Sequence, residues 1–144
     1  MSMPWVRCAF APAVLSLALL TAACNDSPTE PSLSDAVAIE SIVPAANTVL
    51  RRGTQVTITV TVRYSLGSTS EGRLSLVLQD QNNQIIGPLP QPEARVPRGV
   101  GSVTLSNTLT VPATATSVRV FVPLVPQGAT NTSVVATATY TVTS

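Results

Sequence analysis

The chain has 144 residues, with eight lysine or arginine residues against seven acidic ones and no histidine. Without histidine it lacks the commonest proton shuttle and metal ligand. Because basic and acidic residues are nearly equal in number, the charge provides no basic face, and the few aromatic residues provide little surface for stacking bases. The composition therefore excludes nucleic acid as a partner.

The first 23 residues have the pattern of a secretory signal. Arg7 supplies a positive charge, and residues 8–20 form an almost uninterrupted apolar run. This run is shorter than the roughly 20 apolar residues that a membrane helix needs. We therefore predict a signal peptide over residues 1–23.

The signal ends in Leu20-Thr21-Ala22-Ala23-Cys24, where small residues stand directly before a cysteine. This stretch resembles the lipobox of bacterial lipoproteins, in which the cysteine is acylated and becomes the new N-terminus. Thr21 departs from the pattern, since leucine is usual there. The resemblance implies an exported protein that is lipid-anchored to the bacterial cell envelope through Cys24, at the outer membrane or its periplasmic face.

Residues 25–35 are rich in Ser, Pro, Asp and Asn and have no apolar period, which is typical of a linker. We expect residues 24–36 to form the lipidated N-terminus and a flexible linker, and residues 37–144 to form one domain. Cys24 is the only cysteine after the signal, so no intramolecular disulfide can form. Burial alone must hold the domain together.

The first predicted strands lie between residues 37 and 78. Residues 37–43 alternate, with Val37, Ile39, Ser41 and Val43 on one face, and stop at Pro44, which favours an edge strand that residues 49–50 extend. Residues 55–64 alternate apolar and Thr or Arg side chains over ten positions, the strongest indication of a half-buried strand. Leu74, Leu76 and Leu78 repeat this pattern in a further strand.

A turn follows at Asp80, Gln81, Asn82 and Asn83, leading into a short strand at residues 84–86. The acidic and amide side chains suggest a calcium loop, but the spaced carboxylates and closing glutamate of such a loop are absent. Asp and Asn are residues that turns prefer. We therefore predict a hairpin turn and no metal site.

Residues 88–97 are rich in proline and are either a recognition ligand for another protein or a connection between two sheets. We favour the connection and expect no central strand here. Beyond it, Val103, Leu105, Leu109 and Val111 share one face, and the polar Asn107 between them predicts a bulge or a bend.

The last two predicted strands are residues 118–124 and 134–142, joined by a polar loop that includes Gln127 and Asn131. Pro123 lacks a backbone N–H, so we expect the first of these strands to leave the ladder near its end. In the second, threonines occupy one face from Thr137 to Thr143.

About seven short strands without an amphipathic helix predict an all-β fold, a single antiparallel Greek-key β-sandwich. From Val37 to Val142, and best over residues 56–66, the pattern resembles the immunoglobulin-like and fibronectin-type-III-like modules of bacterial surface proteins. The two core cysteines and the tryptophan of antibody domains are missing. This resemblance implies a rigid scaffold.

The residues give no support for an enzyme or a cofactor. A nucleophilic serine needs a base, and the chain has neither histidine nor lysine. The acidic residues fall on separate strands, loops or the linker, so nothing pairs two carboxylates for glycoside hydrolysis. The threonine rows, beginning at Thr57 and Thr137, look like ice-binding faces, but threonine is also the natural polar residue for the wet face of a strand.

Two functions remain open. The first is a non-catalytic, lipid-anchored envelope protein that displays a binding or adhesion module for protein or glycan. The second is a structural spacer or an assembly subunit of the envelope without a specific ligand. Because loops on a rigid scaffold carry recognition, the contact residues expected for a binding module are Asp80, Asn82, Asn83, Gln127 and Asn131.

Overall fold

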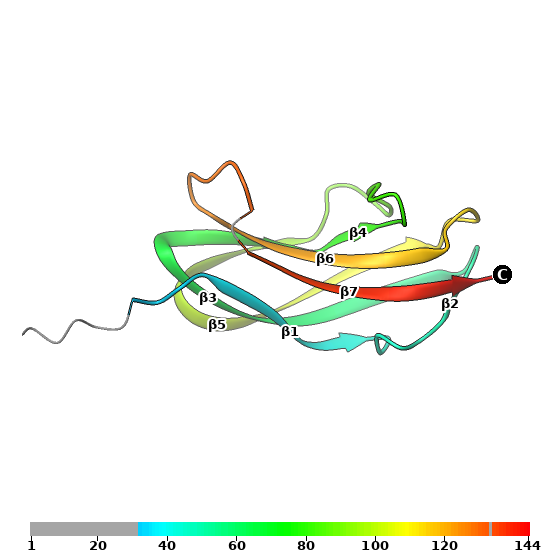
Figure 1. The fold of residues 1–144 in the computed structure, drawn as a ribbon, viewed down its shortest axis with the longest axis horizontal. Coiled ribbons are helices and arrows are strands. Elements are labelled where there is room, and N and C mark those ends of the chain that lie inside the picture. Colours follow the sequence, from blue (N-terminus) through cyan, green and yellow to red (C-terminus); the bar gives the residue numbers. More distant parts are fainter. Residues whose placement is uncertain (1–31, 133) are drawn as a thin grey trace, which may run out of the picture. The chain divides into compact units, whose positions relative to one another are not determined.

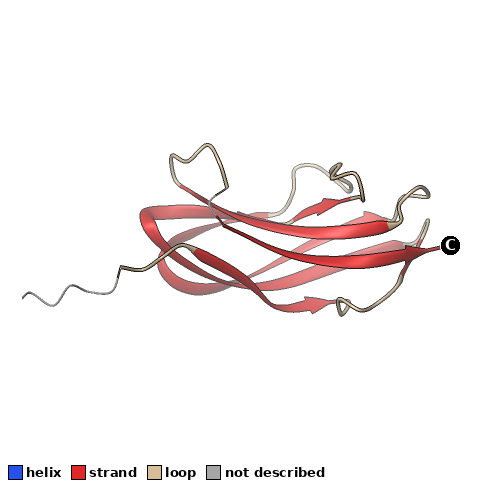
Figure 2. Cartoon of the chain, in the orientation of Figure 1, coloured by secondary structure: helices blue, strands red, loops and turns tan. Residues whose placement is uncertain are grey.

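The computed structural model describes residues 32–132 and 134–144, and every regular element among them is a strand (Figure 2). The signal and Cys24 lie outside the described residues. The elements are β1 (Ala36–Val43), β2 (Leu50–Arg51), β3 (Gln55–Ser75), β4 (Val77–Gln79), β5 (Glu93–Thr110), β6 (Ser117–Pro126) and β7 (Val134–Thr143). The prediction of an all-β domain is confirmed.

The strands form one open mixed sheet. Its main path is β1-β3-β6-β7-β2, with β5 pairing with β3 and β4 pairing with β6. The pairs are antiparallel except that β2 runs parallel to β7, where Leu50 stands opposite Val142. A purely antiparallel fold is therefore wrong at this pair, and residues 49–50 do not extend the edge of β1.

The sheet bends where β3 and β5 curve together (Figure 1). β5 pairs with β3 along both halves, and the register shifts between Leu66 and Glu71. There residues 67–70 of β3 stand opposite the single residue Arg98, and extra residues of this kind bend a strand. What the sequence predicted as two strands, 55–64 and 74–78, is one strand through the bend, followed by the short β4.

The bend creates two layers that face each other across the core. β1, the first half of β3 and the second half of β5 form one layer, and β4, β6 and β7 lie in the other (Figure 1). The alternating apolar residues of both layers meet in a single cluster that includes Ile58, Val60, Leu74, Val120 and Tyr140, none of which is exposed to solvent. Burial of these side chains is the main stabilising term.

Pro123 interrupts one ladder without ending its strand. β6 continues to Pro126, and Pro123 pairs with Val135 of β7, so the expected departure from that ladder is wrong. On the other side, Leu74 faces Leu124 and Val77 faces Phe121, which sets Ser75 opposite Pro123. The missing N–H of Pro123 thus lies where the pairing of β6 passes from β3 to β4.

Residues 93–97 of the proline-rich stretch belong to β5 rather than to a connection between sheets. Pro97 pairs with Glu71. Among the described strands β5 pairs with β3 alone, so it is an edge strand, where a proline is tolerated. The predicted bulge at Asn107 is also wrong. Asn107 keeps its register opposite Ile58, and its side chain is buried.

β1 is an edge strand as predicted, but its alternation breaks at Glu40. The register passes from Ile39 opposite Val62 to Ser41 opposite Thr61, which leaves Glu40 as an extra residue. Beyond this bulge Ile42 packs against the core, and Val43 is exposed. The prediction that Ser41 and Val43 share one face with Val37 and Ile39 is therefore wrong.

The loops gather at two ends of the sheet. We call the end with residues 66–71 of β3 the bend end, and β6 reaches it where Pro126 pairs with Gly72. We call the other end, with the turn at residues 80–84 and residues 112–116, the loop end (Figure 1). From it residues 85–92 return toward the middle of the sheet, where the backbone N–H of Leu76 donates a hydrogen bond to the carbonyl oxygen of Pro92. The ten residues of β6 separate the two ends by about 33 Å.

Candidate functional site

The predicted turn at residues 80–84 is present at the loop end. The Asp80 carboxylate oxygen Oδ1 accepts hydrogen bonds from the backbone N–H groups of Asn82 and Gln84, at 2.8 and 2.9 Å. Asn83 adopts a positive φ of 60°, which asparagine tolerates better than most residues. The strand expected at residues 84–86 is reduced to one bridge between Ile85 and Gln79.

Side-chain contacts fasten this turn to neighbouring elements. The Gln81 oxygen Oε1 accepts a hydrogen bond of 3.1 Å from the backbone N–H of Thr116. The Asn83 oxygen Oδ1 accepts one of 3.2 Å from Arg119, whose guanidinium carbon also lies 5.8 Å from the ring centre of Phe121. The turn is held in place by β6 and the loop before it.

Beyond the turn, the loop exposes two apolar side chains, and side-chain hydrogen bonds hold its backbone in place. Ile85 is 55% exposed and Leu89 is 74% exposed. Beneath them, the buried Asn107 side chain donates a hydrogen bond of 2.8 Å to Gln91, and the Gln91 amide donates one of 3.0 Å to the carbonyl oxygen of Pro88. Sequence reasoning missed both as exposed residues, because it placed Ile85 in a short strand and Leu89 in the proline-rich stretch.

The second predicted loop lies at the opposite end. The backbone N–H of Gln127 donates a hydrogen bond of 2.9 Å to the carbonyl oxygen of Glu71, which fixes the loop to the bend end. Gln127 and Asn131 are exposed. The structure therefore separates Gln127 and Asn131 from Asp80, Asn82 and Asn83 by the length of β6.

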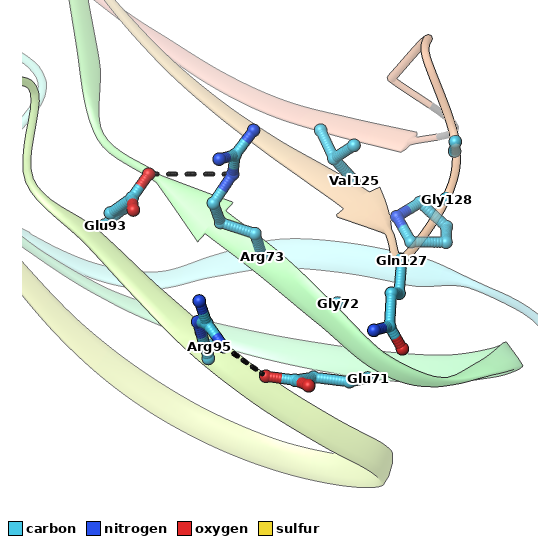
Figure 3. Close-up of a pocket in the computed structure, with 10 residues that line it drawn as sticks. Glu71, Gly72, Arg73, Glu93, Arg95, Val125, Gln127 and Gly128 are labelled. Carbon is cyan, nitrogen blue, oxygen red and sulfur yellow. Dashed lines mark ion pairs between the residues drawn. The ribbon is translucent and has the colours of Figure 1, made fainter.

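Gln127 borders a shallow depression of about 280 Å³ on the outer face of the sheet (Figure 3). Charged side chains of two strands line it, Glu71 and Arg73 from β3 and Glu93 and Arg95 from β5. Arg73 and Arg95 stand directly opposite each other in the register. Such a like-charge pair is unfavourable unless neighbours compensate it.

The two glutamates provide that compensation. The Arg73 Nε atom lies 3.6 Å from Glu93 Oε2, and the Arg95 Nη1 atom lies 3.7 Å from Glu71 Oε1, as the dashed lines of Figure 3 mark. These separations exceed hydrogen-bond length, and the side chains are largely exposed, so each pair contributes at most about 1 kcal/mol. The depression thus carries no net charge that would select a ligand.

The threonine rows do not join into one array. Thr57 and Thr59 of β3 bond through their hydroxyls to Thr108 and Ser106 of β5, at 2.7 and 2.8 Å. The row from Thr137 lies on β7, which pairs with β6 and β2 rather than with β3. Hydrogen bonds between hydroxyl groups of neighbouring strands stabilise the solvent-exposed face of a sheet.

The described residues contain no group of three His, Cys, Asp or Glu side chains placed to hold a metal ion. Nor does this part of the chain include a helix of the length and apolarity that crossing a membrane requires. Cys24, the predicted lipidation site, is outside the described residues. Comparison of the chain with protein-family models and with curated proteins gave no match.

Proposed function

We propose that this chain is a non-catalytic, lipid-anchored protein of the cell envelope that displays an immunoglobulin-like binding module. The anchor is the acylated Cys24, as the lipobox resemblance implies. Binding takes place at the loop end. The observation that carries the proposal is the exposure of Ile85 and Leu89 on a loop whose base is held by Asn107 and Gln91.

The strand pairing supports an immunoglobulin-like, Greek-key interpretation of the fold. In such a sandwich, the strands named A, B and E share one sheet and C, F and G share the other. Here β1, the first half of β3 and the second half of β5 match A, B and E. The second half of β3 with β4, then β6 and β7, match C, F and G.

A protein is the favoured partner. Large apolar side chains on a preformed loop lose little conformational freedom on binding and shed ordered water, which is how protein interfaces gain affinity. Flat aromatic rings, which suit sugars, are scarce. Among the described residues the aromatic side chains are Tyr64 and Tyr140, both buried, and the half-buried Phe121.

The anchor is tested by replacing Cys24 with serine. Two or more acyl chains anchor a protein stably on a bilayer, since each buried methylene contributes about 0.8 kcal/mol. The cleaved Cys24→Ser protein should lose acyl labelling and move from the membrane fraction to the soluble one. Product length must be measured too, because an uncleaved precursor stays membrane-bound through its signal. Soluble wild-type protein with an unmodified N-terminus would refute the anchor.

Binding is tested by cross-linking the membrane-purified protein to envelope extract. Ile85→Ser with Leu89→Ser should abolish one specific cross-linked protein, and Asn131→Ser at the bend end should retain it. Both residues of the first variant are exposed, so its melting temperature should match that of the wild type. Equal capture by both variants would refute the loop end as the binding site.

The alternative, an assembly subunit, rests on the edge of β5. β5 pairs with β3 on one side along its length and with no other strand of the described chain. An unpaired edge offers backbone groups to another strand. Concentration-dependent assembly that persists in the Ile85→Ser, Leu89→Ser variant would favour this function.

A further inference from the structure

The chain is fastened to the bend end before its first strand begins. The Asp35 oxygen Oδ1 accepts hydrogen bonds from the backbone N–H groups of Gly67 and Ser68, at 2.8 and 3.0 Å. Its Oδ2 atom accepts a third, of 2.6 Å, from the Ser68 hydroxyl. The Ser65 hydroxyl donates to the carbonyl oxygen of Ser34 at 2.7 Å. These bonds fix residues that the sequence assigned to the linker.

Gly67 extends this attachment to Leu33. A side-chain carbon at Gly67 would lie 1.4 Å from the Leu33 carbonyl oxygen, so only a glycine allows the two backbones to approach this closely. The N-terminal segment therefore lies on the bend from Leu33 onward. β1 then leads away from the bend end, since Ala36 pairs with Ser65 and Val43 with Thr59.

The reach of the chain between Cys24 and Leu33 is about the length of the domain. Nine residue-to-residue steps join the two, and nine steps span at most about 32 Å. The loop end lies about 33 Å beyond the bend end. The point of attachment at the bend end can therefore lie no more than about 32 Å from a surface that holds Cys24, whereas the loop end can stand farther away by the length of the domain.

We infer that the attachment of residues 33–35 to the bend gives the anchored domain a preferred polarity. The bend end, with Gln127 and Asn131, lies on average nearer the membrane than the loop end, with Asp80, Asn82 and Asn83. This inference rests on the proposed anchor at Cys24. It selects between the two predicted loops, because a partner that approaches from the far side reaches the loop end first.

Energy transfer to a labelled membrane tests this polarity. Acylation consumes the thiol of Cys24 and the signal removes Cys8, so an introduced cysteine is the only free thiol of the mature chain. A donor dye is placed at Asn131→Cys or at Asn82→Cys in the full lipidated protein, which is then reconstituted in phosphatidylcholine vesicles carrying a headgroup acceptor. The donor lifetime should shorten more at Asn131→Cys than at Asn82→Cys.

A longer tether provides the matched control. Inserting about 40 Gly and Ser residues after Thr29 adds a typical span of about 35 Å, comparable to the length of the domain. The difference between the two donor positions should then shrink. Equal lifetimes at the two positions with the natural tether, or a shorter one at Asn82→Cys, would overturn the polarity. Protein that fails to float with the vesicles would instead refute the anchor.

Discussion

The hydroxyl of Tyr140 donates a hydrogen bond of 2.5 Å to the carbonyl oxygen of Pro44. Tyr140 lies in β7 and is fully buried, and Pro44 directly follows β1. The bond therefore joins the two layers where β1 leaves its ladder. Because this hydrogen bond is partly buried, its loss should cost about 1 kcal/mol.

Stability should fall above pH 10 because of this tyrosine. Burial raises the pKa of Tyr140 to about 12, above its ordinary value of about 10. The folded state thus favours the neutral form, so this stability is complete below pH 10 and is lost as the pH rises from about 10 through 12. The loss should reach about 2 to 3 kcal/mol, measured by urea unfolding across this range.

Tyr140→Phe is the control for that titration. It should lower stability by about 1 kcal/mol at neutral pH and flatten the decline above pH 10. The chain contains no lysine, so few other groups titrate in this window. An unchanged slope in Tyr140→Phe would show that Tyr140 does not cause the decline.

The register of β3 is tested by two aspartate substitutions. Val60 is fully buried, so Val60→Asp places an unpaired carboxylate in the core and should cost several kcal/mol, enough to unfold a domain stabilised by about 5 to 15 kcal/mol. Thr57 is exposed on the other face, so Thr57→Asp should cost about 1 kcal/mol or less. Equal melting temperatures would contradict the register.

Much of this strand could be predicted from its alternation, but its continuation past Leu66 could not. Residues 67–70 read Gly-Ser-Thr-Ser, a composition typical of a turn between two strands. In the structure they form the bulge over which β3 bends, while Leu66 and Leu74 both remain in the core. Local composition marks a change of direction without telling whether the strand ends there.

The attachment at the bend predicts non-additive substitutions. Asp35→Ala removes three hydrogen bonds, and Gly67→Ala displaces the Leu33 carbonyl. Each should lower stability by about 1 to 2 kcal/mol. Because both release the same segment, the double variant should lose little more than either single one. Fully additive losses in thermal unfolding would show that the two residues act separately.

The Asp35 contact could not be found by sequence reasoning, because its partners are 32 and 33 positions away. A lone aspartate among Ser and Pro is typical of a linker. The same holds for the two loops predicted to carry contact residues. Turn composition correctly located residues 80–84 and the loop with Gln127, but only the pairing of β6 shows that they occupy opposite ends.

The side chain of Asn107 should keep residues 85–92, the loop that carries Leu89, structurally ordered. Asn107→Ala removes the donor to Gln91 and should cost about 1 to 3 kcal/mol. Amide hydrogen exchange over residues 85–92 should become faster, whereas the exposed neighbour Ser106→Ala should leave it unchanged. Unaltered exchange in Asn107→Ala would show that the loop is held by other contacts.

The way the chain enters the sheet also decides how the protein carries mechanical load. In the proposed anchored protein, a partner held at the loop end and an anchor acting through Leu33 would pull from opposite ends, along the direction of β1 and β3. The hydrogen bonds of the β1–β3 ladder lie across that direction. They are therefore loaded together, in shear, rather than opened one after another, so the ladder that ties the anchor to the domain resists tension with all of its bonds at once.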